Sequence, residues 1–209
     1  MKTVLLIGDS IRMGYDKSTA KTLSDVANVY FPDENCRFAA YVLRNLPDYR
    51  DILPEKTADV VHWNAGLWDC LHQYAEDANT PLEIYTYYIE RVCARIKNLF
   101  PNATVIFATS TSVVTEEMPP DFKRYNSEIE QYNAAATEIA ERYGFEINDL
   151  YALSTALPPE AHSDSVHYYT PIGTKAFTDR VVQHIGQALG LDEIPVYQEE
   201  LYTDKPIGI

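Results

Sequence analysis

Cysteine is scarce in this chain: the 209 residues include three, Cys36, Cys70 and Cys93. Three irregularly spaced cysteines are too few for a disulfide framework, and no Cys-x-x-Cys pair points to structural zinc. A reducing compartment is the simplest setting for such a composition. We therefore expect a cytoplasmic protein.

Basic residues are also in short supply, with 17 Lys and Arg against 31 Asp and Glu, which gives a formal net charge of −14. The acidic residues are scattered along the chain, and such a surface repels nucleic acid and anionic membranes, so we predict neither as a partner. Long hydrophobic runs are missing as well. The apolar stretch of residues 4–7 is too short for a signal peptide, and no later stretch is long enough to span a bilayer.

What the chain does contain suits a folded domain, because 46% of its residues are hydrophobic and 23% are charged. Short β-branched runs alternate with longer segments of helical period, which predicts an α/β fold with three layers, α/β/α. We expect about five buried parallel strands in a doubly wound, flavodoxin-like order. These strands are predicted over residues 4–7, 26–31, 59–63, 103–108 and 145–147.

Amphipathic stripes predict four helices, over residues 38–46, 85–99, 129–143 and 171–189. Gly144 and Gly190 are placed to end the third and fourth of these helices, and Pro171 to begin the fourth. We predict a single domain over residues 1–190. The stretch 191–209 contains two prolines and no helical period, so it is expected to be a C-terminal extension packed on the same domain.

Ser10 is the first candidate for chemistry, because Gly8, Asp9 and Ser10 directly follow the first expected strand. In a doubly wound sheet, sites lie beyond the carboxyl ends of the strands. The simpler interpretation is that Asp9 and Ser10 cap a following helix. A serine hydroxyl is a poor nucleophile at neutral pH, so a catalytic role requires a base within hydrogen-bond reach and a third group that holds the base.

The segment AHSDSVHYYTP supplies both groups. Asp164 and His167 stand three apart in a loop before the last expected helix, so one turn can bring the carboxylate against the imidazole and leave the other ring nitrogen facing outward. His62 falls in an expected strand and His184 in an expected helix, which favours structural roles. As an alternative, four residues could bind one metal ion; they are Asp9, His162, Asp164 and His167. The chain lacks the HxH and HExxH spacings of common metal-binding motifs, which argues against this alternative.

The quartets GDSI, at residues 8–11 after the first strand, and DSVH, at residues 164–167 before the last helix, resemble motifs of the GDSL or SGNH hydrolase family. The resemblance covers residues 4–189 and implies that family's fold. It also implies that Ser10 is the nucleophile, that His167 is the general base and then the acid, and that Asp164 orients His167, with no metal or other cofactor.

The family's oxyanion hole uses the serine amide, the amide of a glycine in a second motif and an asparagine side chain in a third. The stretch ENCRFAAYVLRNL lacks the glycine, and the family's spacing puts Cys36 in its place, where a backbone N–H can still donate. In HWNAGLWDC, Gly66 and Asp69 match the third motif, but Trp68 stands at the asparagine position and the nearest amide is Asn64. We therefore predict three oxyanion donors, which are the backbone N–H groups of Ser10 and Cys36 and the side-chain amide of Asn64. As alternatives, Asn64 only forms a turn by bonding its own backbone, or the Trp68 indole N–H donates in its place.

Five residues around these motifs are candidates for binding substrate: Asp9, Arg12, Gly66, Trp68 and Tyr168. Aromatic faces near a catalytic loop can stack on sugar rings, whereas for Trp63 core packing is the better interpretation. Arg12 follows the expected nucleophile by two residues. It either binds an anionic or hydroxylated substrate or pairs with a local carboxylate.

These features favour a serine esterase that cleaves a short-chain acyl ester through an acyl-enzyme, with an acetyl group on a carbohydrate as the preferred substrate. Its partner is then a small ester molecule such as an acylated sugar. One alternative keeps the triad but passes the acyl group to another alcohol. A second is a non-catalytic carbohydrate-binding module, suggested by the departures from the oxyanion motifs and opposed by the intact Ser10, Asp164 and His167.

Overall fold

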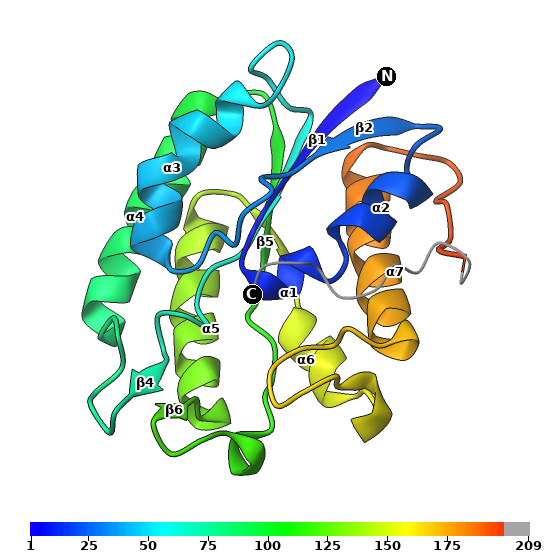
Figure 1. The fold of residues 1–209 in the computed structure, drawn as a ribbon. Helices are drawn as coiled ribbons and strands as arrows, with labels where there is room; N and C mark the ends of the chain where they lie inside the picture. The colour runs from blue at the N-terminus through cyan, green and yellow to red at the C-terminus, as the bar shows by residue number, and fades with distance from the viewer. Residues whose placement is uncertain (199–209) are drawn as a thin grey trace.

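Five parallel strands form one sheet in the order β2-β1-β3-β5-β7 in the computed structural model, which describes residues 1–198 (Figure 1). β1 pairs with both β2 and β3, so that Val4 lies opposite Val29 and Val60. The order confirms the predicted flavodoxin-like sheet, and every predicted strand is present. The strands are β1 (Lys2–Ile7), β2 (Ala27–Tyr30), β3 (Val60–Trp63), β5 (Thr104–Ala108) and β7 (Glu146–Asn148).

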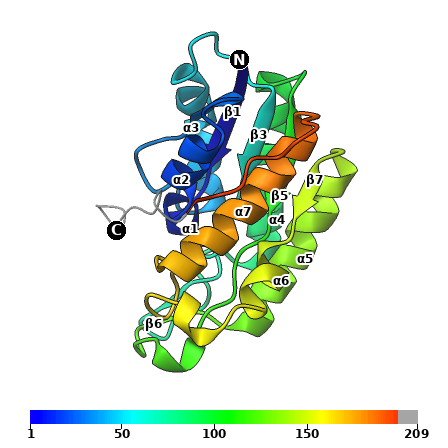
Figure 2. The same cartoon turned by 90° about the vertical axis from the view of Figure 1, so that its right-hand side faces the viewer.

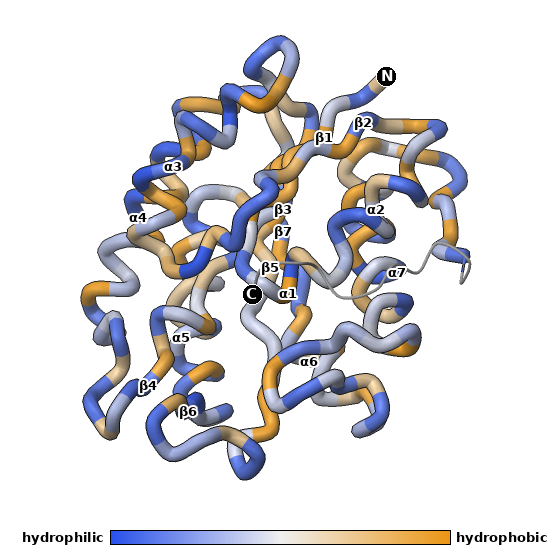
Figure 3. The backbone as a smooth tube through the Cα atoms, in the orientation of Figure 1, coloured by the Kyte–Doolittle hydropathy of each residue, from blue (hydrophilic) through white to orange (hydrophobic). Residues whose placement is uncertain are grey.

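The central strands are buried because helices cover both sides of the sheet. All four residues from Val4 to Ile7 in β1 have no exposed surface. Figure 3 shows the consequence, with hydrophobic strands in the middle of the molecule and mostly hydrophilic segments at its periphery. A strand covered on both faces needs a continuous apolar run, which is the pattern that predicts it from the sequence.

Three long helices cover one face of the sheet, and α7 with the shorter α2 covers the other (Figures 1 and 2). α3 packs on α4, α4 on α5, and α2 on α7. The four predicted helices are confirmed, and Gly144 and Gly190 follow α5 and α7 with φ of 72° and 69°, the left-handed conformation in which glycine ends helices. The helices are α2 (Asp16–Thr22), α3 (Ala39–Asp51), α4 (Leu82–Leu99), α5 (Asn126–Arg142) and α7 (Pro171–Ala188).

Several short elements lie outside the sequence prediction. They are helices α1 (Ser10–Met13) and α6 (Leu150–Thr155), the 3-10 turns η1 (Thr115–Glu117) and η2 (Pro159–Ala161), and the antiparallel strands β4 (His72–Gln73) and β6 (Phe122–Lys123). The longer α2 was also not predicted. Its sequence, DKSTAKT, has no apolar stripe, so hydrophobic periodicity gives no sign of a helix.

The chain beyond α7 lies against that helix in the part that is described. Ile194 packs on Gly186, where an added Cβ would come within 2.9 Å of the Ile194 side chain. The Tyr197 N–H donates to Asp179 Oδ1 at 3.1 Å. These contacts concern the first part of the predicted extension over residues 191–209, and residues 199–209 lie outside the described residues. Within residues 1–198, no helix is long and apolar enough to cross a membrane.

Candidate active site

Ser10, His167 and Asp164 meet beyond the carboxyl end of β1, although 157 positions separate the serine from the histidine. Ser10 Oγ lies 2.8 Å from His167 Nε2, and His167 Nδ1 lies 2.9 Å from both carboxylate oxygens of Asp164. One ring nitrogen thus faces a hydroxyl and the other a carboxylate. This is the geometry that activation of a serine nucleophile requires.

The turn after β1 presents Ser10 to the imidazole. Ser10 is the first residue of α1, and Asp9 is the N-cap, whose Oδ1 accepts a hydrogen bond from the Ile11 N–H at 3.0 Å. The capping interpretation is therefore correct for Asp9. Its side chain is fully buried, and burial raises the pKa of the carboxyl group. Asp9 supports the turn from inside, which corrects the prediction that it contacts substrate.

A closed turn over residues 163–167 holds the imidazole in place. Asp164 Oδ1 accepts hydrogen bonds from the backbone N–H groups of Val166 and His167, each at 2.9 Å, and the Ser163 N–H donates to the His167 carbonyl at 2.8 Å. Partial burial opposes ionisation of Asp164, but these N–H groups and the imidazole together lower its pKa below the usual value. The carboxylate is ionised at neutral pH and can stabilise a protonated imidazole.

Asn64 stands just beyond the end of β3, beside the turn that carries Ser10. Its backbone N–H donates to the Ile7 carbonyl at 3.0 Å, and its side chain is buried. A Cβ added at Gly8 would lie 2.0 Å from Asn64 Oδ1, so only glycine leaves room for this side chain. The structure brings Asn64 to the turn that carries the serine, while its role as an oxyanion donor stays a prediction.

Cys36 does not offer the donor that the sequence predicts. Its backbone N–H donates to the Gly8 carbonyl at 3.1 Å, so this N–H is already used within the protein. The thiol is free and buried, and burial raises its pKa. Motif spacing located the residue, but the loop conformation turns its N–H toward the end of β1.

Arg12 holds this loop against α1. Its guanidinium pairs with Asp16 and donates to the carbonyls of Pro32 and Glu34, at 2.9 Å and 2.5 Å. The side chain is 1% exposed. Pairing with a local carboxylate is therefore the correct alternative, and the prediction that Arg12 binds substrate is wrong because its charge is buried and satisfied internally.

Two further predicted substrate contacts, Gly66 and Tyr168, belong to the packed interior. A Cβ at Gly66 would lie 2.3 Å from Ser110 Oγ, so this glycine allows a close approach of two loops. Tyr168 is buried, and its hydroxyl donates to the Ser112 carbonyl at 2.9 Å. Trp68, in contrast, is half-buried and retains some exposed surface.

Sequence reasoning missed Arg124, and it placed Tyr169 among the aromatic residues near the site without assigning it a contact with the triad. Arg124 is buried, donates from Nε to the Leu67 carbonyl, and lies 6.0 Å from the Trp68 ring centroid. The Tyr169 ring stacks on His167, and its hydroxyl donates to the Ser10 carbonyl at 2.5 Å. Nothing in the sequence around Arg124 marks it, whereas the two tyrosines after DSVH are visible but give no sign of which one faces His167.

The four residues of the metal alternative do not gather around one point. Asp9 caps α1, whereas the His162 ring packs on the Tyr168 ring, with centroids 4.1 Å apart and planes inclined by 38°. Within residues 1–198, no cluster of three or more His, Cys, Asp or Glu side chains is arranged to hold a metal ion.

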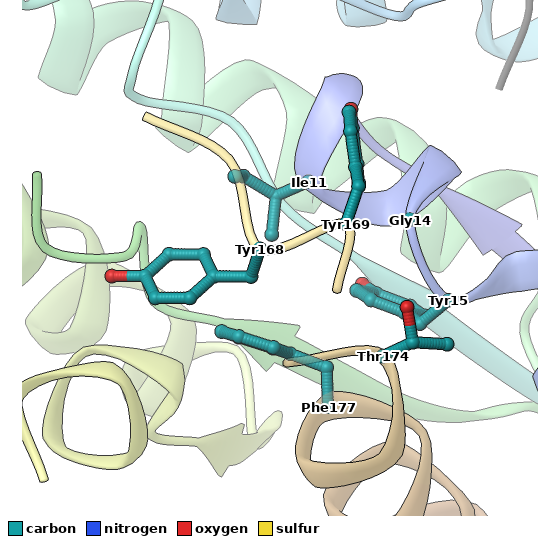
Figure 4. A pocket seen from close by; sticks show the side chains of 7 residues that line it. All are labelled: Ile11, Gly14, Tyr15, Tyr168, Tyr169, Thr174 and Phe177. Carbon is teal, nitrogen blue, oxygen red and sulfur yellow. The ribbon is translucent and has the colours of Figure 1, made fainter. Parts of the chain in front are cut away.

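Among the cavities lined by residues 1–198, two lie near the triad. One, of about 520 Å³, borders Asp164 and His162 but not Ser10 or His167. The other is a space of about 10 Å³ beside α1, which is too small for anything larger than one water molecule (Figure 4). Its lining residues are Ile11, Gly14, Tyr15, Tyr168, Tyr169, Thr174 and Phe177.

Comparison with protein families agrees with this geometry. The sequence model of the GDSL-like Lipase/Acylhydrolase family matches residues 6–170, most of the chain. The chain belongs to this family. It is accordingly a GDSL-like hydrolase, although no curated protein matches it in sequence.

Solved structures share the GDSL-like fold at low sequence identity. The lipase/acylhydrolase from Enterococcus faecalis is 20% identical with a TM-score of 0.70, over 90% of this chain and 96% of that one. The acetyl xylan esterase AlAXEase is 17% identical with a TM-score of 0.68, over 88% and 99% of the two chains. A catalytic mutant of the acetylxylan esterase Axe2 from Geobacillus stearothermophilus is 18% identical with a TM-score of 0.66, over 88% and 94%. At such identities the likeness establishes the fold.

Proposed function

We propose that this GDSL-like hydrolase is a serine esterase that removes a short acyl group, acetyl in particular, from a hydroxyl of a carbohydrate. The observation that carries the proposal is the 2.8 Å contact between Ser10 Oγ and His167 Nε2, with Asp164 on the opposite ring nitrogen. The carboxylate fixes the tautomer in which Nε2 is free to accept the serine proton.

In the first half of the proposed reaction, His167 Nε2 takes the Ser10 proton while Oγ attacks the ester carbonyl carbon. The Ser10 N–H and the Asn64 side-chain amide stabilise the negative charge on the carbonyl oxygen. The C–O bond to the sugar then breaks, and His167 gives its proton to the departing oxygen. Asp164 stays ionised throughout and stabilises the imidazolium.

In the second half, water attacks the acyl-enzyme and gives a proton to His167. The tetrahedral intermediate collapses, the bond between Ser10 Oγ and the acyl carbon breaks, and the proton returns to Ser10. The products are the free acid and an unmodified enzyme. If this step is slow, the alcohol is released in a burst before steady turnover.

Two features support an acetylated sugar as substrate. Trp68 is half-buried on the loop after β3, and we propose that it packs on a sugar face. Two of the enzymes whose solved structures share the fold, AlAXEase and Axe2, are acetyl xylan esterases. These two features are the reason that we propose a short acyl group on a carbohydrate as the substrate.

The test is hydrolysis of p-nitrophenyl acetate and butyrate, followed by acetylated xylo-oligosaccharides, by the wild type and by Ser10→Ala and His167→Ala. We expect the wild type to prefer acetate and each variant to lose about 10⁴-fold or more in kcat. Wild-type turnover no faster than that of the variants would contradict the proposal. Added alcohol acceptors distinguish an acyltransferase, which would yield a new ester in place of free acid.

One observation favours a second candidate, a carbohydrate-binding module without turnover. The Cys36 N–H bonds to the Gly8 carbonyl, so one of the three predicted oxyanion donors is absent. Calorimetric binding of an acetylated sugar without release of acetate would support the module. Release of acetate that depends on Ser10 would exclude it.

A further inference from the structure

We propose that Tyr169 is a positioning residue for the Ser10–His167 pair, acting on both members at once; this inference rests on the proposed function. Its ring stacks on the His167 imidazole with centroids 4.7 Å apart and planes inclined by 17°. Its hydroxyl donates to the Ser10 carbonyl at 2.5 Å. One rigid side chain thus connects the turn that carries the nucleophile with the loop that carries the base.

The imidazole needs this third contact. The Asp164 carboxylate fixes Nδ1, and Ser10 Oγ approaches Nε2, but both contacts lie in the plane of the ring. Neither contact prevents the ring from tilting out of that plane. The Tyr169 ring covers one face of the imidazole and restricts this tilt. Because misplacement of a catalytic group by about 1 Å can cost 100-fold in rate, this restriction is expected to affect turnover.

The same stacking favours the protonated imidazole that forms in the transition state. A cation placed over the face of an aromatic ring is attracted by the ring's quadrupole, and the attraction increases when water is excluded. Tyr169 is 6% exposed, and the His167 side chain is 14% exposed, so the contact is largely shielded from solvent. The stacking therefore stabilises the state in which His167 holds the serine proton.

The surroundings fit Tyr169 closely. A Cβ added at Gly14, at the end of α1, would lie 2.6 Å from Tyr169 Cε1, so glycine is needed there for the ring to pass. Figure 4 shows Tyr168 and Tyr169 pointing in different directions, with Gly14 next to Tyr169. Tyr168 extends toward Ser112 in the interior, whereas Tyr169 reaches Ser10. Adjacent tyrosines thus have different roles.

Two substitutions separate the two contacts. Tyr169→Phe keeps the stacked ring and removes the hydrogen bond to Ser10, and we expect kcat to fall about threefold to tenfold. Tyr169→Leu removes both contacts, and we expect its kcat to fall about 30-fold or more. The kcat of Tyr169→Phe should lie between that of Tyr169→Leu and that of the wild type, because phenylalanine keeps the stacked ring. KM is expected to change little in both, because Tyr169 holds the triad and not the substrate.

Tyr132→Phe is the matched control, since Tyr132 is a buried tyrosine whose hydroxyl also donates to a backbone carbonyl, that of Thr80, at 2.7 Å. Thermal unfolding is measured for all variants. A purely structural role for Tyr169 predicts that kcat per folded molecule is the same in Tyr169→Phe and Tyr132→Phe. That result, or wild-type kcat in Tyr169→Leu, would overturn the inference.

Failure of the proposed function gives a different result. In that case the wild type itself shows no hydrolysis that depends on Ser10, and it does not react at Ser10 with a fluorophosphonate, a reagent for activated serines. When the wild type reacts, the rate of fluorophosphonate labelling is compared among the variants. We expect labelling to slow in Tyr169→Leu and to be unchanged in Tyr132→Phe; equal rates would contradict the Tyr169 proposal and leave the esterase proposal standing.

Discussion

Replacing Gly8 by alanine is expected to disable the proposed oxyanion hole by displacing the Asn64 side chain. The added Cβ would lie 2.0 Å from Asn64 Oδ1 and 2.8 Å from the Arg12 Cβ. Gly8 does not have a positive φ, so alanine can adopt its backbone conformation and the effect comes from contact. Since a Cβ rarely approaches a heavy atom within about 3 Å, the Asn64 side chain must move by roughly 1 Å.

A shift of that size is enough to remove a hydrogen bond to an oxyanion. Loss of one such donor lowers kcat by about 10²-fold to 10³-fold, so we expect Gly8→Ala to lose about 100-fold in kcat on p-nitrophenyl acetate. Overpacking is also expected to lower the free energy of unfolding by about 1 to 3 kcal/mol. Urea unfolding therefore accompanies the kinetics and establishes that the variant is folded during the assay.

The double variant Gly8→Ala/Asn64→Ala decides whether the effect passes through Asn64. If the alanine acts by displacing the amide, the double variant has the kcat of Asn64→Ala within about threefold, because the two changes remove the same interaction. A further 100-fold fall in the double variant would refute this reasoning. So would wild-type kcat in Asn64→Ala, since the amide would then have no part in catalysis.

Two further predictions concern buried charges. Arg12→Met leaves Asp16 buried without its partner and is expected to lower the free energy of unfolding by about 3 to 5 kcal/mol, measured in urea. Arg12→Met/Asp16→Leu removes the unpaired charge and should recover part of the loss, since the Pro32 and Glu34 carbonyls still lack their donor. Equal stability of the two variants would contradict the pairing argument. Burial raises the pKa of the Asp69 carboxyl group to about 7. Between about pH 4 and pH 7 the folded state therefore keeps a proton that the unfolded state releases, so the free energy of unfolding falls as the pH rises through this range. Wild-type stability should therefore decline relative to Asp69→Asn over that range in urea unfolding, and parallel pH profiles would contradict it.

The sheet and the long helices are readable from the sequence because each depends on a local pattern. The buried run Val4 to Ile7 predicts a strand covered on both faces, and the stripe that includes Tyr85, Ile89 and Val92 predicts α4. α2 has no such pattern: DKSTAKT is held by its packing against α7. Periodicity therefore reports the elements that form the core and overlooks those that are fixed by tertiary contacts.

The site divides in the same way. Ser10 and His167 stand in short motifs at strand and helix ends, so the sequence places them together correctly. The hydrogen-bond partner of the Cys36 N–H could not be predicted from motif spacing, because the direction of this N–H depends on how Arg12 fixes the preceding loop. The Tyr169 ring can lie beside His167 because Gly14 leaves room for it, and no pattern in the sequence indicates this close approach.

The most direct test of the central claim, that His167 activates Ser10 as a nucleophile, is covalent labelling with a fluorophosphonate followed by peptide mass mapping. We expect one adduct, on the peptide that contains Ser10, and at least a 100-fold slower reaction in His167→Ala. An unlabelled wild type, an adduct on another residue, or labelling that is equally fast without His167 would contradict it.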